Sequence, residues 1–407
     1  MELRPGYKQT EAGVILEDWD VKQLGEVIEK IVGGGTPSRS IQHYWGGEIP
    51  WVTVKDFATF NPRHSQEAIT RTGLQNSASH LIPKGTLITS TRMALGKAAV
   101  YEVDVAINQD LKALFLKPVL KTQFLHYWFQ YHEKIIDDMG SGSTVKGISL
   151  PDLKKIEFLL PTRPEQEAIA EALSDADALI ESLEQLIIKK RHIKQGAMQQ
   201  LLSGKKRLPG FSGEWQVKRL GDVVEIVSGG TPKTGVSAYW DGDIKWCTPT
   251  DITGTAGKYL SETARTISGV GLANCSARLL PAGALLLCSR ATIGEIKIAT
   301  GAICTNQGFK SLICGKDVSN EYLYYLLLTM KARIVEKAIG STFLEISKKD
   351  AFLLEVSLPP IDEQTAIAQI LTDMDAEIAA IEARRDKTRA IKQGMMQALL
   401  TGRTRLI

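Results

Sequence analysis

Histidine and cysteine, the residues that most often supply metal ligands and nucleophiles, lie in opposite halves of this sequence. The histidines are His43, His64, His80, His126, His132 and His192, and the cysteines are Cys247, Cys275, Cys288, Cys304 and Cys314, with no CxxC pair. A phosphate-binding GxxxxGK loop is absent, because Gly96–Lys97 lacks the upstream glycine and the following hydroxyl residue. Residues 61–64 read NPRH, which departs too far from an NPPY-type adenine-methylation motif.

The two halves of the chain are copies of one unit about 200 residues long. WDVKQLGEV (19–27) returns as WQVKRLGDV (215–223), GGTP (34–37) returns at 229–232, and LPTRPEQEAIAEAL (160–173) returns as LPPIDEQTAIAQIL (358–371). Because copies of one sequence share a fold, a zinc site, disulfide or histidine-based centre found in one copy cannot be structurally obligatory. The sequence therefore predicts a chain with no catalytic centre of its own.

Several polar residues are shared by the copies. Arg92 and Arg290 match, and each suits a phosphate contact or a structural ion pair equally well. Asn108–Gln109 and Asn306–Gln307 could reach adenine edges, but residues common to both copies are poor at discriminating between bases, which favours structural hydrogen bonding. GGTP is interpreted either as a turn with glycines at positive φ, which we favour, or as a backbone cradle for a phosphate.

Each unit begins with a mixed domain. Strand-like runs cover 49–54, 86–91 and 98–107 in the first copy and 244–249, 284–289 and 295–305 in the second. Helices are expected at about 122–138 and 320–339, before last strands at 156–161 and 353–359. The stripe Phe124, Tyr127, Trp128 and Tyr131 recurs every three or four positions and indicates core packing. These patterns predict an α+β fold with short strands.

Each unit ends in one long helix, roughly 164–202 and 362–400, with Gly204 and Gly402 just past the ends. Apolar residues alternate in steps of four and three in both helices, at Ile169, Leu173, Ala176, Ile180, Leu183 and Ile187, and at Ile367, Leu371, Met374, Ile378 and Ile381. This spacing predicts a coiled-coil seam.

Charge predicts that the two helices pair antiparallel. Acidic residues dominate the first half of each helix and basic residues the second, so antiparallel pairing brings unlike charges together and suits each helix dipole. A 39-residue helix spans roughly 58 Å. Two similar domains at opposite ends of such a rod would suit two half-sites on a DNA duplex. A generic spacer or interaction scaffold is the alternative.

The bulk composition permits nucleic-acid binding without requiring it. The net charge is only +3, so any DNA-binding face must come from local clustering. No apolar run approaches the ~18–20 residues that span a bilayer. The first residues lack the apolar core of a secretory signal. A reduced, cytoplasmic protein is expected.

The ordered combination TEAGVILEDWDVKQLGEV, GGTP, YWGGEIPWVTVKD, SGSTVKGIS and LPTRPEQEAIAEAL, followed by its second copy, closely resembles the specificity subunit of type I restriction–modification systems. The resemblance spans essentially the whole chain. One departure is Pro164–Glu165–Gln166, where Asp362–Glu363–Gln364 has the more usual form.

The resemblance implies two similar α/β target-recognition domains, at 1–162 and 215–360, separated by conserved helices at 163–203 and 361–407 that form an antiparallel coiled coil, with a linker at 204–214. Each domain would read one half of a split double-stranded DNA target, and the helices would set the gap and bind two methyltransferase subunits. Adenine methylation and ATP-dependent cleavage would belong to the methyltransferase and restriction subunits, which would hold S-adenosylmethionine, ATP and Mg²⁺. This chain would bind no cofactor or metal.

Discrimination between bases is expected where the copies differ on a matched framework, above all at 57–72 and 252–268. The candidate DNA-binding residues are Lys55, Arg63, His64, Gln66, Arg71, Arg92, Lys97, Ser143, Lys146, Thr250, Lys258, Arg265, Arg290, Thr292, Ser341 and Thr342. The candidate partner-binding residues are Glu165, Gln166, Lys190, Lys194, Glu363, Gln364, Arg385 and Lys392. The basic helix ends could instead be solvated or paired across the coil.

Overall fold

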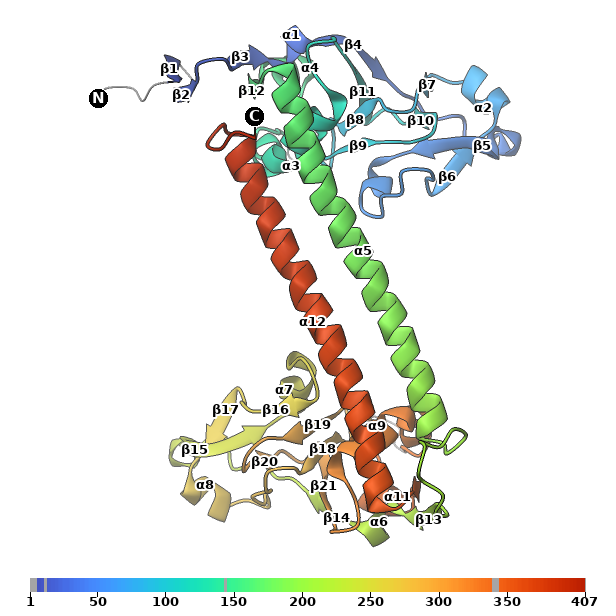
Figure 1. The fold of residues 1–407 in the computed structure, drawn as a ribbon, viewed down its shortest axis with the longest axis vertical. Helices are drawn as coiled ribbons and strands as arrows, with labels where there is room; N and C mark the ends of the chain where they lie inside the picture. The colour runs from blue at the N-terminus through green and yellow to red at the C-terminus, as the bar shows by residue number, and fades with distance from the viewer. Residues whose placement is uncertain (1–5, 11–12, 143–144, 339–343, 407) are drawn as a thin grey trace. The chain divides into compact units, whose positions relative to one another are not determined.

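The computed structural model describes residues 6–10, 13–142, 145–338 and 344–406. The chain divides into two compact units (Figure 1). Unit 1 comprises Met1–Ser182 and Arg384–Ile407, and unit 2 comprises Leu183–Ala383. Each unit contains one α+β domain together with parts of both long helices.

The domain of unit 1 is built on two four-stranded sheets. The first, in the order β6–β5–β10–β7, comprises β6 (Glu67–Ile69), β5 (Trp45–Val52), β10 (Val105–Ile107) and β7 (Leu81–Ile82), with β5 and β10 parallel. The second is antiparallel and comprises β4 (Ile28–Gly33), β11 (Leu111–Leu116), β8 (Leu87–Ser90) and β9 (Ala98–Val100). Two short pairs join β1 (Tyr7–Thr10) to β2 (Gly13–Leu16) and β3 (Asp20–Gln23) to β12 (Glu157–Leu160).

Short helices connect these strands. They are α1 (Leu24–Val27), η1 (Gln42–Tyr44), η2 (Val54–Phe57), α2 (Arg71–Gln75) and α4 (Leu150–Lys155). The longer α3 (Thr122–Asp138) has the predicted bounds. Phe124, Tyr127 and Trp128 are 0–2% exposed and Tyr131 is half-buried, so the aromatic stripe is core packing as predicted.

Unit 2 has the same two main sheets, but among the described residues one has five strands instead of four and the other has three instead of four. Its sheets are β14 (Val224–Ser228), β21 (Phe309–Cys314), β18 (Leu285–Cys288), β19 (Ile296–Ala299) and β16 (Tyr259–Leu260), then β17 (Arg265–Ile267), β15 (Trp240–Cys247) and β20 (Cys304–Thr305), and the pair β13 (Gln216–Arg219) and β22 (Glu355–Leu358). Its helices are α6 (Leu220–Val223), η3 (Ser237–Tyr239), α7 (Pro249–Gly254), α8 (Gly269–Ala273), α9 (Asn320–Thr329), α10 (Lys331–Glu336) and α11 (Lys348–Phe352). Strand β16 comes from the segment in which the copies differ in length.

Three predicted elements are divided in the structure. The run 295–305 forms β19 and β20, which lie in different sheets. The run 98–107 forms β9 and β10 in different sheets, because the turn between them is fixed by hydrogen bonds from Gly85 N to Tyr101 O and from Lys84 N to Asp104 Oδ1. The expected helix 320–339 is interrupted at Met330, whose backbone leaves the helical region at ψ 1° while its side chain is 5% exposed in the core.

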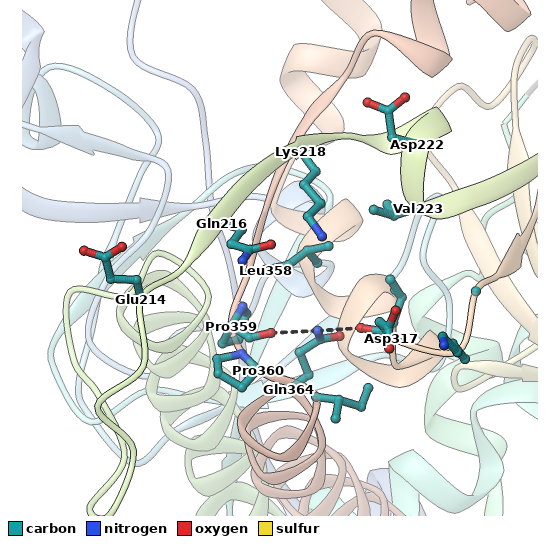
Figure 2. Close-up of a pocket in the computed structure, with 14 residues that line it drawn as sticks. Glu214, Gln216, Lys218, Asp222, Val223, Asp317, Leu358, Pro359, Pro360 and Gln364 are labelled. Atoms are coloured by element: carbon teal, nitrogen blue, oxygen red, sulfur yellow. Dashed lines mark hydrogen bonds between the residues drawn. The ribbon is translucent and has the colours of Figure 1, made fainter.

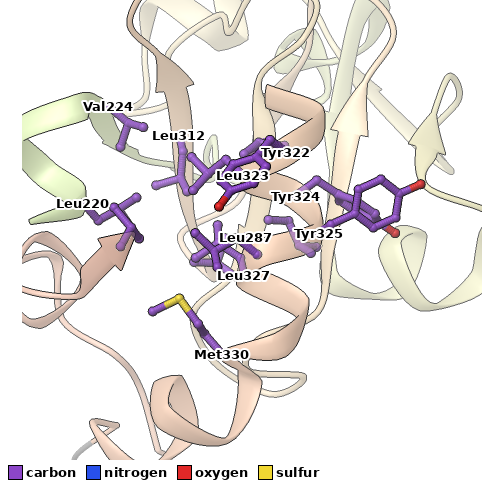
Figure 3. Close-up of a cluster of buried hydrophobic side chains, with 14 of the residues drawn as sticks. Leu220, Val224, Leu287, Leu312, Tyr322, Leu323, Tyr324, Tyr325, Leu327 and Met330 are labelled. Atoms are coloured by element: carbon purple, nitrogen blue, oxygen red, sulfur yellow. The ribbon is translucent and has the colours of Figure 1, made fainter. Parts of the chain in front are cut away.

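Each domain core includes the start of one long helix and the end of the other. In unit 2, the cluster around Leu220, Leu312 and Tyr322 (Figure 3) also contains Ile367, near the start of α12 (Ile361–Leu399), and Leu201, the last residue of α5 (Arg163–Leu201). The matching core of unit 1 contains Ile169, Leu173, Met396, Leu399 and Leu400. Because burying such a side chain contributes roughly 1.5–3 kcal/mol, these contacts fix each domain to both helices.

The two long helices run antiparallel within each unit, as their charges predict. In unit 1, Lys392 Nζ lies 2.6 Å from Asp177 Oδ1. In unit 2, Lys190 Nζ lies 2.5 Å from Glu377 Oε1, and Lys194 pairs with Asp375. Higher numbers on α5 therefore face lower numbers on α12. Leu183 and Ile187 are 3–5% exposed, which confirms the seam.

Candidate nucleic-acid interface

The GGTP turn lies against the ends of the two parallel strands. Gly35 N donates to Ile107 O (3.0 Å), and Gly230 N donates to Thr305 O (2.9 Å). A Cβ on Gly34 would lie 1.8 Å from Ile107 O, so only glycine fits. The glycines of GGTP are not among the residues with positive φ, so the expected reason for them was wrong. They are required by close backbone packing.

Three further segments join the turn at this place. Asn108 N donates to Val52 O (3.0 Å), which brings the residues after β5 and β10 together. Thr36 Oγ1 donates to Gln109 Oε1 (2.7 Å). Thr91 N donates to Asp110 O (2.9 Å), which adds the turn that carries Arg92. The shared Asn–Gln pair is therefore bonded into the framework, as favoured from the sequence.

Unit 2 repeats this assembly. Asn306 N donates to Cys247 O (3.0 Å), Thr231 Oγ1 bonds to Gln307, and Ser289 N donates to Gly308 O (2.8 Å). We call the assembly the shared edge. It comprises 34–37, 53–56, 90–93 and 108–110 in unit 1, and 229–232, 248–251, 288–291 and 306–308 in unit 2. Carboxyl ends of parallel strands are a recurrent place for ligand sites in α/β sheets.

A cluster of two cations and one carboxylate lies on the shared edge of unit 1. Arg92 is 55% exposed in its side chain, and its NH1 lies 3.6 Å from Oδ1 of Asp110. Lys112 Nζ donates to the carbonyl oxygens of Gln109 (2.7 Å) and Leu111 (3.1 Å). Burial lowers the pKa of Lys112, and the charge of Asp110 partly opposes that shift. Two cationic side chains thus share one carboxylate, which gives the cluster a formal net positive charge.

Unit 2 keeps both cations but takes its carboxylate from another position. Lys310 Nζ donates to Glu345 Oε1 (2.8 Å), and Glu345 pairs through its backbone with Arg290. Glycine stands where each unit lacks the acid, at Gly308 in unit 2 and Gly147 in unit 1. Burial opposes the lowered pKa of Glu345, but the hydrogen bond and charge of Lys310 outweigh it. The two-to-one ratio of cations to acids is thus preserved.

The residue after each shared arginine has a strained backbone. Met93 has φ 70° and Ala291 has φ 62°, the left-handed region that disfavours side chains. Neighbouring segments hold the turns, through Met93 N to Lys146 O (3.0 Å) and the bridge between Arg290 and Glu345. Strain of this kind, of order 1–3 kcal/mol, concentrates at functional sites.

The other predicted DNA-binding residues are dispersed. Arg63 pairs with Glu102 (2.7 Å), Lys146 with Asp137 (2.7 Å) and Lys97 with Glu133 (3.9 Å). Arg265 stacks over Trp240, 3.7 Å from the ring centroid. Lys55, His64, Gln66, Arg71 and Thr250 are exposed, and Thr292 is half-buried. Ser143, Ser341 and Thr342 lie outside the described residues.

Lys258 differs from the expectation of an exposed loop residue. Its side chain is 7% exposed, and it pairs with Glu321 and donates to Thr372 Oγ1 (2.7 Å) on α12. The ammonium group is already engaged between the domain and the helix, so Lys258 holds the loop in place instead of facing DNA.

The Glu–Gln pairs at the helix starts are also internal, which corrects their assignment as partner contacts. Glu165, Gln166, Glu363 and Gln364 are 0–1% exposed. Gln364 lies beside a cavity of about 540 Å³ (Figure 2), where its Nε2 donates to Pro359 O (2.8 Å) and Asp317 O (3.1 Å). Gln166 makes the matching bonds to Pro161 O and Val119 O.

Two arginines that the sequence analysis missed neutralise the buried glutamates. Arg207, which follows α5, binds both oxygens of Glu363 at 2.6 and 2.7 Å. Arg405, which follows α12, binds Glu165 at 3.0 and 3.2 Å. The repeated patterns LLSGKKRL (201–208) and LLTGRTRL (399–406) were the available signal.

The remaining partner candidates are engaged within their own units. Lys190, Lys194 and Lys392 pair across the coil, and Arg385 lies 2.8 Å from Asp386. Within the described part of the chain, no helix is long and apolar enough to cross a membrane, and no group of three metal-binding side chains is present.

Both halves of the chain are similar to known proteins. The chain matches the type I restriction modification DNA specificity domain twice, over residues 16–190 and 212–389. The MjaIX specificity subunit of Methanocaldococcus jannaschii is 39% identical over 164 residues, which are 40% of this chain and 38% of that protein. The putative MjaX specificity subunit of the same organism is 25% identical and matches over 98% of this chain and 97% of its own length.

Solved structures agree on the fold. The S subunit of a type I restriction–modification system from M. genitalium covers 98% of this chain and 99% of its own, with a TM-score of 0.59 and 17% identity. A chain from a study of complex assembly in the type I system gives a TM-score of 0.60 at 18% identity, over 96% of this chain and 99% of its own. The double family match, the relative matched over its whole length and this common fold together show that the chain belongs to the specificity subunits of type I restriction–modification systems.

Proposed function

We propose that the chain is the non-catalytic, DNA-reading subunit of its complex, and that each domain reads one half of a split target. The observation that carries this proposal is the shared edge, which occurs twice with the same framework and different surroundings. Arg92 and Arg290 suit contacts to phosphate, which are independent of sequence, while the differing loops suit base discrimination.

The long helices have two further roles in this proposal. They set the gap between the half-sites, and their outer faces bind methyltransferase subunits. In unit 2, Leu186 and Ile193, seven residues apart on one face of α5, are 38% and 46% exposed, and exposed apolar side chains on one face are typical of protein interfaces. We expect S-adenosylmethionine, ATP and Mg²⁺ on the methyltransferase and restriction subunits, and a complex that acts in the cytoplasm.

Electrophoretic binding and selection from random duplex DNA test this proposal, with and without a methyltransferase subunit. The expected product is two short sequences separated by an unspecified gap, with weak binding by the chain alone. A scaffold that holds methyltransferases without reading DNA would add no sequence preference, and that result would refute the proposal.

Exchange of residues 213–358 for the matching domain of a relative tests the independence of the halves. Sequencing of methylated adenines should then show a change in one half of the target. A change in both halves would contradict independent reading. Because Lys258 lies within this range and bonds to Thr372 outside it, the incoming domain should carry a lysine at the matching position.

A further inference from the structure

One carboxylate closes a surface loop at the shared edge of unit 1. Asp56, 3% exposed, accepts hydrogen bonds from Thr53 N (2.8 Å) and Thr53 Oγ1 (3.1 Å) through Oδ2. Its Oδ1 accepts from Gln66 N (2.7 Å). Thr53 precedes the loop 57–65, and Gln66 lies between this loop and β6. The two ends of the loop are therefore joined through a single side chain.

Unit 2 repeats these three bonds. Asp251 accepts from Thr248 N (2.7 Å), Thr248 Oγ1 (2.7 Å) and Ala264 N (2.8 Å), and Ala264 directly precedes β17. The loop closed in this way is 252–263, three residues longer than 57–65. A carboxylate that accepts several N–H and O–H bonds is a strong and well-oriented acceptor. The hydrogen bonds that close the loop are thus the same in both units, while the loops differ in sequence and length.

Beyond the closure the two loops are held by different contacts. In unit 1, Arg63 Nε lies 2.7 Å from Glu102 Oε2, and the ring of Phe60 packs edge-on against Tyr101 at 5.3 Å. In unit 2, Lys258 ties the loop to α9 and α12, and Lys297 donates to Thr255 O (2.8 Å). The loops share the bonds to the aspartate and one hydroxyl bond at their ends, from Ser65 Oγ to Glu67 O (2.6 Å) and from Thr263 Oγ1 to Arg265 O (2.7 Å). The closure therefore accommodates loops of different sequence and length.

We propose that Asp56 and Asp251 are positioning residues for DNA reading, and that the loops they close, 57–65 and 252–263, discriminate the bases of their own half-sites. This inference rests on the proposed function. Asp56 is buried and Asp251 is half-buried, while Phe60, Arg63 and His64 are exposed. A loop closed at its base loses less conformational freedom when it binds. The aspartates therefore act on recognition through the loops and need not touch DNA.

The substitutions Asp56→Asn and Asp251→Asn test the inference in the full chain with a methyltransferase subunit. Asparagine has nearly the same shape but one oxygen acceptor, so its NH2 must face one N–H donor. We expect Asp56→Asn to lower base discrimination at one or more positions of one half-site at least tenfold, leaving the other half unchanged. Asp251→Asn should have the reverse effect. The readout is selection from random duplex DNA.

Thr53→Val is the matched control. It removes the hydroxyl bond of the turn but leaves the bond from Gln66 N to Asp56, so it should lower stability without changing base preference. A combined change of the exposed residues Phe60, Arg63 and His64 to alanine leaves the closure intact and should alter the same half-site as Asp56→Asn, which covers the case in which that variant fails to fold.

The outcomes separate this inference from the proposed function. If the unchanged chain selects no split sequence, the proposed function fails. If it does, but the aspartate and loop variants leave both halves intact or relax both halves equally, the loops are not independent reading elements and the inference is overturned. Relaxation by Thr53→Val to the same degree would reduce the aspartates to a structural role.

Discussion

Removing either partner of the Lys258–Glu321 ion pair should have very unequal effects on the stability of unit 2. The ammonium group of Lys258 lies among Glu321, Thr372 Oγ1 (2.7 Å) and Tyr325 OH (3.4 Å), and its side chain is 7% exposed. Glu321 is 26% exposed and also accepts from Tyr259 OH (2.6 Å). The buried cation thus depends on the acid more than the acid depends on the cation.

These contacts set the expected magnitudes. Glu321→Ala leaves a buried ammonium with hydroxyl groups and the rings of Tyr259 and Tyr325 nearby but without its acid partner, which costs about 3–5 kcal/mol. Lys258→Met fills the same volume with an apolar chain and leaves Glu321 hydrated and bonded to Tyr259, so the cost is about 1–2 kcal/mol. The double variant Lys258→Met, Glu321→Leu removes both charges and should be close to neutral.

The measurement is urea unfolding of the full chain, with amide hydrogen exchange to follow each unit, because a chain of two units need not unfold in one step. Exchange in unit 1 is the internal control and should not change. If Lys258→Met costs more than Glu321→Ala, or if the double variant is as unstable as Glu321→Ala, the unpaired buried cation is not what destabilises the Glu321→Ala variant.

Three further predictions concern pH, salt and helix length. Burial lowers the pKa of His126 to about 4, below the ~6.5 of an unfolded histidine, so this group should cost unit 1 about 1.4 kcal/mol per pH unit as pH falls from 6.5 towards 4. His126→Tyr, which copies Tyr324 of unit 2, should reduce the loss of stability between pH 7 and pH 5 in urea titrations. A smaller slope should remain, because burial also lowers the pKa of His132. Arg92→Glu or Arg290→Glu should weaken binding to all sequences and flatten the salt dependence by about one unit each, and an unchanged slope in a folded variant would assign a structural role. Four residues inserted after Leu183 should lengthen the gap by about one or two base pairs with both half-sequences unchanged; methylation at the original gap would mean that the helices do not set the spacing.

The long helices and their antiparallel pairing could be predicted because their signals lie along the chain. The apolar spacing from Ile169 to Ile187 repeats every three or four residues, and that period depends only on helix geometry. The acidic first half and the basic second half of each helix likewise predict antiparallel pairing from the sequence alone. In the structure each long helix begins and ends one residue earlier than expected, at Arg163–Leu201 and Ile361–Leu399.

The partners of individual polar groups could not be predicted in this way. Glu363 looked like a surface motif, but it is paired with Arg207, 156 residues away in sequence. Lys258 looked like a loop cation, but its acid lies 63 residues further along the chain. A charged side chain carries no local mark of whether it is buried, because burial depends on which segments fold over it.

At the shared edge, some residues could be predicted from the sequence and others could be identified only from the fold. The repeat alone marked Arg92 and Gln109 as common to both copies, since identical residues at one offset can be read from the sequence. The acid near the shared arginine could be identified only from the fold, because Asp110 and Glu345 do not occupy matching positions in the two copies. Hydrogen bonds between distant strands and turns bring each acid to the cations, and such long-range pairing depends on the whole domain and not on any local sequence period.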